Sequence, residues 1–382
     1  MNDVEPELLV DDVDAIDRLD PSGMLRAIAT AGAQVRTAAR EHAAAGELVA
    51  RVVDDGRPRA IVVAGMGGSG VSGDVLAAVV GPRCPVQVVT VRDYLLPGWV
   101  GALDLVLAVS CSGRTEETLA LVDEAIRRGA RLVGVGPPGS PLAGRVEAAG
   151  GVVLPARNEG RAPRASLWAL SVPLLLLADA LGLTSVPSAM LDGLADRLDQ
   201  LAERCAPVSM LDGNPAKALA LELVGTVPMV WGSGVVGGVA AYRFACQLNE
   251  NAKYPAVHGA LPEVNHNQVV AFDGRFAADA SSDDLFRDRT DDPFGDPHLR
   301  LVLLRDVEEH PQVARRAEVS AQLAEESGVA VTELRAEGEH PLERLAGLVA
   351  LGDFASAYLG ILAGVDPTPV TPITVLKQRI VP

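Results

Sequence analysis

Short apolar runs recur along the first half of the chain and alternate with longer segments of helical character. The runs are Arg59–Ala64, Val86–Val91, Asp104–Val109, Arg131–Val135 and Gly151–Pro155. Runs of this length, apolar at nearly every position, are typical of strands that are buried on both faces of a parallel sheet. The segments between them, such as Thr115–Gly129, suit helices. The pattern therefore predicts a parallel sheet with helices on both faces.

The same pattern starts again in the second half of the chain. Strand-like runs and long helical stretches occur at Thr226–Trp231, Gly237–Lys253, Leu299–Leu304, Val329–Leu334 and Leu342–Leu362. In each half a strand is followed by Gly-Ser-Gly and then by a helix, at residues 68–70 and 232–234. We therefore predict an α/β fold with two similar units in tandem, the second of them modified.

The pattern also predicts where the parts of the chain begin and end. Residues 1–55 form a helical lead containing Met24–Arg51, residues 56–186 the first α/β domain, residues 187–214 a connector, and residues 215–382 the second domain with a C-terminal helical tail. The longest apolar stretch, Ser166–Leu183, contains a proline and an aspartate, so it is predicted as a buried helix and not as a membrane span. The polar segment Asp279–Pro297 is predicted as a solvated surface insertion.

Composition narrows the classes of partner. The 382 residues are 48% hydrophobic and 3% aromatic, with a net charge of −17. The apolar content excludes extensive disorder, and the negative charge together with few aromatic side chains argues against nucleic acid as a partner. No signal peptide or membrane segment is readable, and four scattered cysteines suit reduced thiols, so we expect a cytoplasmic protein. The cysteines are Cys84, Cys111, Cys205 and Cys246.

The first strand-to-helix junction is a glycine loop. Its sequence, Gly65-Met66-Gly67-Gly68-Ser69-Gly70, fits G-x-G-x-x-G between a strand and a helix. Such a loop lets a phosphate approach amide groups at a helix N-terminus, and Asp93 after the next strand is a candidate ribose ligand. The loop therefore fits a dinucleotide, another phosphate ligand, or a tight turn that binds nothing.

A second junction carries hydroxyl groups. Ser110, Ser112 and Thr115 follow the third strand within six residues, and Gly113 between them permits a positive φ. Thr115 is a candidate N-cap, with two glutamates in the first helical turn after it. Hydroxyl and amide donors at a helix N-terminus suit a phosphate monoester. A good helix start alone would explain Thr115 but not the two serines.

Together, the two loops resemble the sugar isomerase (SIS) domain, a flavodoxin-like fold in which both loops bind the phosphate of a phosphosugar. The resemblance implies two tandem SIS-type domains and favours a phosphosugar over a dinucleotide in the glycine loop. By position, the phosphate-binding residues would be Gly67, Gly68, Ser69, Ser110, Ser112 and Thr115. Arg114 stands where the family more often has asparagine.

Motifs elsewhere resemble one branch of this superfamily, the bifunctional phosphoglucose/phosphomannose isomerases. They are Leu19–Met24 (LDPSGM), Pro163-Arg164, Asn249–Lys253 (NENAK), Leu261–Gln268 (LPEVNHNQ) and Lys377. The resemblance implies cofactor-free interconversion of glucose 6-phosphate or mannose 6-phosphate with fructose 6-phosphate through a cis-enediolate. It also implies a homodimer with a shared active site.

The resemblance also implies roles for single residues. Glu250 would move the proton between C1 and C2, His266 and Lys377 would assist ring opening, and Arg164 would stabilise the enediolate. Gln268 stands where glutamate is common, which would remove a carboxylate able to tune His266. Taken singly, Glu250 is better explained as an ordinary carboxylate on a helix surface, and Arg164 and Lys377 also fit structural roles. Only the joint occurrence of these residues favours an enzyme.

Two other functions stay open on the sequence alone. A phosphosugar-binding protein without catalysis would keep both loops, and the substitutions at Arg114 and Gln268 motivate it. A nicotinamide-dependent dehydrogenase would use the glycine loop and Asp93. A metal site is not expected, because His258 and His266 have no third ligand in pattern.

Overall fold

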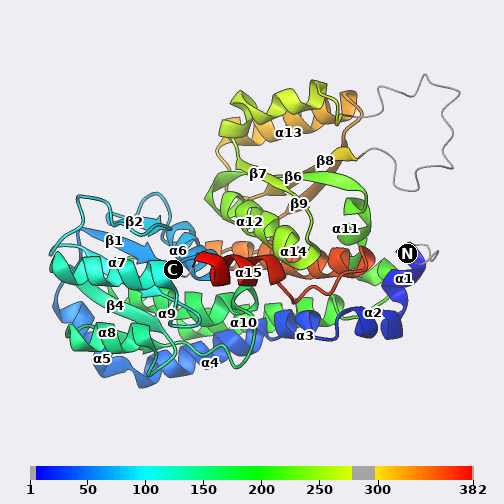
Figure 1. Cartoon of the computed structure of the whole chain (residues 1–382). Helices are drawn as coiled ribbons and strands as arrows, with labels where there is room; N and C mark the ends of the chain where they lie inside the picture. Colours follow the sequence, from blue (N-terminus) through cyan, green and yellow to red (C-terminus); the bar gives the residue numbers. More distant parts are fainter. Residues whose placement is uncertain (1–5, 278–296, 381–382) are drawn as a thin grey trace, which may run out of the picture. The chain divides into compact units, whose positions relative to one another are not determined.

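A computed structural model describes residues 6–277 and 297–380 (Figure 1). The chain divides into two compact units: one is Ala29–Gln200, and the other joins the N-terminal segment up to Ile28 to the chain from Leu201 onward. The domain boundaries expected from the sequence stay a prediction. The surface insertion expected at Asp279–Pro297 lies, apart from Pro297, outside the described residues.

The Ala29–Gln200 unit is built on a parallel five-stranded sheet in the order β2-β1-β3-β4-β5. Its strands are β1 (Ala60–Ala64), β2 (Gln87–Val91), β3 (Leu105–Val109), β4 (Arg131–Gly136) and β5 (Val152–Pro155). Every residue of β1 and β3 is buried, as the unbroken apolar runs predict. The predicted parallel sheet is confirmed, with each strand within a residue of its expected position at either end.

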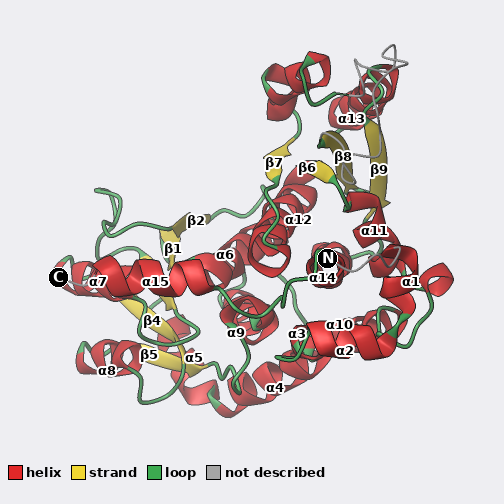
Figure 2. Ribbon diagram, turned by 45° about the vertical axis from the view of Figure 1, so that its right-hand side comes forward, coloured by secondary structure: helices red, strands yellow, loops and turns green. Residues whose placement is uncertain are grey.

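Helices cover both faces of this sheet, as Figure 2 shows, with α6 and α9 on one side and α7 and α8 on the other. The helices of the unit are α4 (Ala31–Ala44), α5 (Gly46–Asp54), α6 (Gly67–Val80), α7 (Glu116–Arg127), α8 (Pro141–Ala148), the 3₁₀ turn η1 (Pro163–Ala165), α9 (Leu167–Ala180) and α10 (Ser188–Arg204). The apolar stretch Ser166–Leu183 forms α9, which is buried as predicted.

The other unit has a parallel four-stranded sheet in the order β7-β6-β8-β9. Its strands are β6 (Thr226–Gly232), β7 (Val257–Ala260), β8 (His298–Arg305) and β9 (Ala330–Arg335). Strand β7 was not among the strands predicted from the sequence. This short edge strand is largely exposed and has no apolar run. The order repeats that of the first four strands, β2-β1-β3-β4, which confirms the prediction of two similar α/β units.

In the second sheet α13 covers one face and α12 covers the other (Figure 1). Helix α14 packs against both α12 and α11. The helices of the unit are α1 (Pro6–Asp11), α2 (Val13–Leu19), α3 (Met24–Ala29), η2 (Leu211–Gly213), α11 (Pro215–Leu223), α12 (Gly234–Gln247), the π-helical turn η3 (Leu248–Ala252), η4 (Glu263–His266), η5 (Gln268–Asp273), α13 (Pro311–Glu326), α14 (Pro341–Leu362) and α15 (Thr371–Ile380). The helical segment expected over Met24–Arg51 is helical but divided into α3, α4 and α5.

One helix, α14, is long and apolar enough to cross a membrane by length and composition. Of its most apolar window, 83% is buried inside the structure. It packs against α11 and α12, and its buried residues lie on all sides of the helix. Burial all round is the property of a core helix in a globular domain.

Candidate active site

The two predicted phosphate loops lie at one edge of the first sheet, where its connections diverge. The chain leaves β1 through α6 to β2 on one side, and leaves β3 through α7 to β4 on the other side. The loops after β1 and β3 therefore flank the topological switch point at the carboxyl ends of the strands. Ligands of doubly wound sheets with this strand order bind at that point.

The glycine loop forms the uncapped start of α6. Met66 precedes the helix in an extended conformation, and within the described chain no side chain caps this end. Gly67 has a φ of +49°, and a Cβ added to Gly68 would lie 3.0 Å from the Pro163 carbonyl oxygen. These glycines thus serve the tight turn, and the open helix start also leaves amide groups for an anion. A tight turn that binds nothing and a loop that binds a phosphate would therefore have the same backbone geometry here.

The hydroxyl loop joins β3 to α7. Ser110 is buried and its Oγ lies 2.9 Å from the Thr115 Oγ1, while Ser112 is exposed and its Oγ accepts a hydrogen bond from the Arg114 amide at 3.2 Å. Gly113 has the predicted positive φ, +64°, and a Cβ added to it would collide with the side chain of Ser140. Thr115 precedes α7, but the expected side-chain cap is wrong, because its hydroxyl pairs with Ser110 instead.

A hydrogen bond joins the two loops to each other, and the glycine loop packs against the segment that precedes α9. The Cys111 amide donates to the Ser69 Oγ at 3.2 Å. Burial raises the pKa of the Cys111 thiol, which keeps it neutral. A Cβ on Gly68 would lie 3.0 Å from the Pro163 carbonyl oxygen, in the segment that precedes α9. The structure therefore brings together the glycine loop, the hydroxyl loop and the segment that carries Arg164.

Two arginines lie near the glycine loop. Arg164 sits in η1, is only 4% exposed, and its Cα lies 3.5 Å from where a Cβ on Gly68 would be. Arg92, which the sequence analysis did not select, has its Nε 2.8 Å from where a Cβ on Gly70 would lie, and it forms an ion pair with Asp74. Its position directly after β2, beside Asp93, was the available signal. Both guanidinium groups thus lie beside the glycine loop, and Asp74 balances the charge of Arg92.

Asp93, the candidate ribose ligand, is exposed. Its Oδ1 accepts a hydrogen bond from the amide of the next residue, Tyr94, at 2.6 Å. The carboxylate thus caps its own turn, an ordinary local role for aspartate. This contact gives the dinucleotide interpretation no support.

Glu250 lies in the other unit, in the π-helical turn η3 at the end of α12. The turn ends at Lys253, which has a φ of +56°. It is packed against α14: the Asn251 Nδ2 donates to the Ser356 Oγ at 2.9 Å, and a Cβ on Gly360 would lie 2.7 Å from the Asn251 carbonyl oxygen. The helix end predicted here is confirmed, and π-helical turns of this kind often occur at functional sites.

His266 and Lys377 lie on two further segments of the same unit. His266 is exposed at the end of η4, and Lys377 is exposed on α15. Gln268 is held away from a tuning role: its Oε1 accepts from the Trp231 Nε1 at 2.7 Å, and its Nε2 donates to the His258 carbonyl oxygen at 3.0 Å. Its amide therefore joins β6 to β7.

The junction after β6 corresponds to the glycine loop but is built differently. Ala64 pairs with Ala108, and Gly232 pairs with Leu304. Two residues beyond these pairs stand Ser110 in the first sheet and Asp306 in the second. A carboxylate thus replaces a hydroxyl at the equivalent position, which agrees with the prediction that the second unit is modified.

Asp306 fills the position that an anion would take at the start of α12. Its amide donates to the Ser233 Oγ at 2.9 Å, and its carboxylate pairs with the buried Arg344 at 2.7 Å. Its Oδ2 lies 3.7 Å from where a Cβ on Gly234, the first residue of α12, would be. A carboxylate at this position opposes a second anion at the start of α12, whereas the first sheet has a hydroxyl group at the equivalent position.

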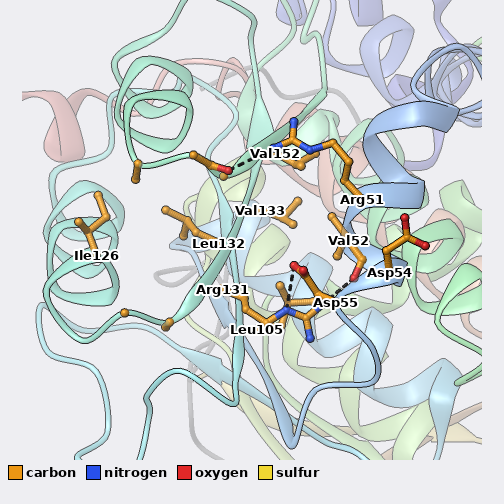
Figure 3. Close-up of a pocket in the computed structure, with 15 residues that line it drawn as sticks. Arg51, Val52, Asp54, Asp55, Leu105, Ile126, Arg131, Leu132, Val133 and Val152 are labelled. Carbon is orange, nitrogen blue, oxygen red and sulfur yellow. Dashed lines mark hydrogen bonds and ion pairs between the residues drawn. The ribbon is translucent and has the colours of Figure 1, made fainter.

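A pocket of about 540 Å³ lies at the opposite edge of the first sheet (Figure 3). The amino ends of β3, β4 and β5 and the end of α5 line it. Arg131 in this pocket donates to the carbonyl oxygens of Val52 and Gly56 and pairs with Asp55. The pocket is therefore separate from the two loops. Among the described residues no cluster of metal-ligating side chains occurs.

The fold and the paired loops at its switch point define a SIS-domain protein, and comparisons agree. A family model described as the bacterial phospho-glucose isomerase C-terminal SIS domain matches residues 212–380. A crystal structure of a hypothetical protein from Thermus thermophilus has a TM-score of 0.66 at 19% identity, over 96% of this chain and 93% of that one. A glucose-6-phosphate isomerase from Chlamydia trachomatis has a TM-score of 0.69 at 13% identity, over 98% and 84%.

Sequence relatives identify the branch. The bifunctional phosphoglucose/phosphomannose isomerase of Caldicellulosiruptor bescii is 32% identical, over 84% of this chain and 89% of that protein. The protein of the same name from Aquifex aeolicus is 30% identical, over 84% and 90%. The chain belongs to the bifunctional phosphoglucose/phosphomannose isomerase family, so the resemblance drawn from the motifs is confirmed.

Proposed function

We propose that this protein is a cofactor-free isomerase that interconverts glucose 6-phosphate, and also mannose 6-phosphate, with fructose 6-phosphate. Family membership supports the reaction class, since the relatives are named for both isomerisations. The observation that carries the proposal is the joining of the glycine and hydroxyl loops through Ser69 and Cys111 at the switch point of the first sheet. Two uncapped helix starts and three hydroxyls suit a phosphate monoester.

In this proposal the phosphate is held by the six loop residues predicted from the sequence. They are Gly67, Gly68, Ser69, Ser110, Ser112 and Thr115. Ser69 has a second task, because its hydroxyl already accepts the Cys111 amide and so fixes one loop to the other. Exposed Ser112 and the amides of Gly67 and Gly68 are then the groups most open to the ligand.

The proton chemistry is assigned to Glu250, which moves a proton between C1 and C2 through a cis-enediolate. Arg164 stabilises the negative oxygen of that intermediate, a role that its burial favours because a charge acts more strongly where water is excluded. His266 and Lys377 assist the opening of the sugar ring. This reaction consumes no electrons and transfers no group, so the residues of the chain suffice for it.

We also propose that the protein works in the cytoplasm as a homodimer with a shared active site. The dimer follows from the family pattern, and the cytoplasmic location from the four scattered cysteines, which suit reduced thiols. Sedimentation of the purified protein tests the first point: a monomer that retains full turnover would contradict the shared site.

The test of the function is fructose 6-phosphate formation from each aldose phosphate separately, without added metal or nucleotide. The proposal predicts turnover of both. Turnover of only one would restrict the substrate, and turnover of neither would contradict the isomerase. A titration with the same compounds, followed by calorimetry, then distinguishes a phosphosugar-binding protein without catalysis, which would bind without converting, from a protein of another class.

A further inference from the structure

We infer that Lys253 is a positioning residue that fixes the main chain of Glu250 to the segment leading to Lys377; this inference rests on the proposed function. Lys253 is the last residue of the NENAK motif, and the family resemblance gave it no functional role. The lysine follows the π-helical turn directly and has a positive φ, +56°. Residues other than glycine rarely have a positive φ, so contacts with the surrounding residues must stabilise this backbone conformation of Lys253.

What holds Lys253 is a set of main-chain carbonyl oxygens. The Nζ donates to the carbonyl oxygens of Glu250 at 2.9 Å and of Asn251 at 3.3 Å. It also donates to those of Asp366 at 3.0 Å and of Pro367 at 3.0 Å. A charged ammonium surrounded by four carbonyl oxygens makes strong hydrogen bonds and joins two segments that are more than 110 residues apart.

These two segments are the ones that carry proposed catalytic residues. The π-helical turn carries Glu250, and the 366–367 turn leads directly into α15, which carries Lys377. On its other side the π-helical turn rests on α14 through Asn251 and Gly360. Glu250 therefore lies on a turn held from two sides, and Lys253 supplies the contact that also reaches the start of the C-terminal helix.

The N-terminal motif Leu19–Met24 contacts the 366–367 turn. The Asp20 carboxylate accepts hydrogen bonds from the amides of Met24 and Leu25 at 2.7 and 2.9 Å, which shapes the bend that contains Ser22. The Ser22 Oγ donates to the Asp366 Oδ2 at 3.1 Å. The N-terminal motif, the NENAK motif and the 366–367 turn are thus three parts of one arrangement around Lys253.

The test replaces Lys253 by methionine, which keeps the length of the side chain and removes its donors. We expect kcat to fall by about tenfold to a hundredfold, as small displacements of catalytic groups do, with KM changed by less than about threefold. The matched control is Thr226→Val, which removes a hydroxyl bond to the Leu223 carbonyl elsewhere in the same unit and should leave kcat unchanged.

Hydrogen exchange gives a readout that does not depend on activity. In the Lys253→Met variant, amides at Tyr254 and over residues 364–368 should exchange faster than in the wild type, while those of α13 should not change. Unchanged exchange at these amides, or faster exchange with an unchanged kcat, would overturn the inference. If the wild-type chain itself forms no fructose 6-phosphate, the proposed function fails, and the exchange result alone then decides whether Lys253 fixes the two segments.

Discussion

At the scale of single residues, Gln268 has a structural role that the sequence did not predict. The family resemblance implies glutamate at the position of Gln268, so we expected a missing carboxylate partner for His266. In the structure the amide accepts from the fully buried Trp231 and donates to the His258 carbonyl oxygen. Only a side chain that is both donor and acceptor can make this pair of bonds.

We therefore predict that Gln268→Glu weakens the protein without raising its turnover. The carboxylate would face the His258 carbonyl oxygen with no proton to share, and the loss of this exposed hydrogen bond should cost about 0.5–1.5 kcal/mol of unfolding free energy. Urea unfolding and kcat on glucose 6-phosphate measure the two effects. A variant as stable as the wild type, with faster turnover, would show that the glutamine does limit catalysis.

At the scale of helices and strands, the sequence predicted positions well and pairings poorly. Apolar runs located all the strands of the first sheet because burial on both faces leaves a continuous signal. The edge strand β7 left no such signal. The buried pair of Arg243 on α12 and Asp353 on α14, at 2.7 and 3.0 Å, could not be predicted, because nothing local links residues 110 positions apart. The two loops were predictable because their chemistry lies within a few consecutive residues.

This helix pair leads to a stability prediction. Asp353→Asn keeps the shape of the side chain but removes the Asp353 carboxylate from the buried Arg243 guanidinium, which should cost about 3–5 kcal/mol of unfolding free energy. The control Glu318→Gln breaks an exposed pair with Arg315 and should change stability by less than about 1 kcal/mol. Equal, small effects of the two substitutions in urea unfolding would contradict this account of α12 and α14.

At the scale of the whole molecule, stability should depend on pH through a half-buried histidine. Burial lowers the pKa of His42, although the nearby Asp179 acts in the opposite direction. In the unfolded chain the pKa of His42 is about 6.5, which is above its pKa in the folded protein. As the pH falls through about 6.5, the unfolded chain therefore binds the proton more readily than the folded protein does. The contribution of His42 to the free energy of unfolding then decreases. His42→Gln should lose less stability than the wild type between about pH 7.5 and 5.5 in urea unfolding. An equal or larger loss would contradict this assignment.

The two units also differ in what they offer a ligand. Equivalent junctions carry hydroxyls in the first sheet and the Asp306–Arg344 pair in the second, so the repeated fold presents two chemically different edges. The sequence showed the repeat through Gly-Ser-Gly, but the carboxylate that fills the second copy lies more than 70 residues further along. Only strand pairing reveals that it occupies the position of Ser110.

The central claim is that Glu250 transfers the proton in an aldose–ketose isomerisation, and one comparison tests it most directly. Fructose 6-phosphate formation from glucose 6-phosphate is measured for the wild type, for Glu250→Gln, and for Glu326→Gln, an exposed carboxylate at the end of α13 that serves as control. The account predicts that kcat falls by about 10²–10⁴-fold in Glu250→Gln alone, the usual contribution of a general base. A folded Glu250→Gln variant that keeps the wild-type kcat would contradict it.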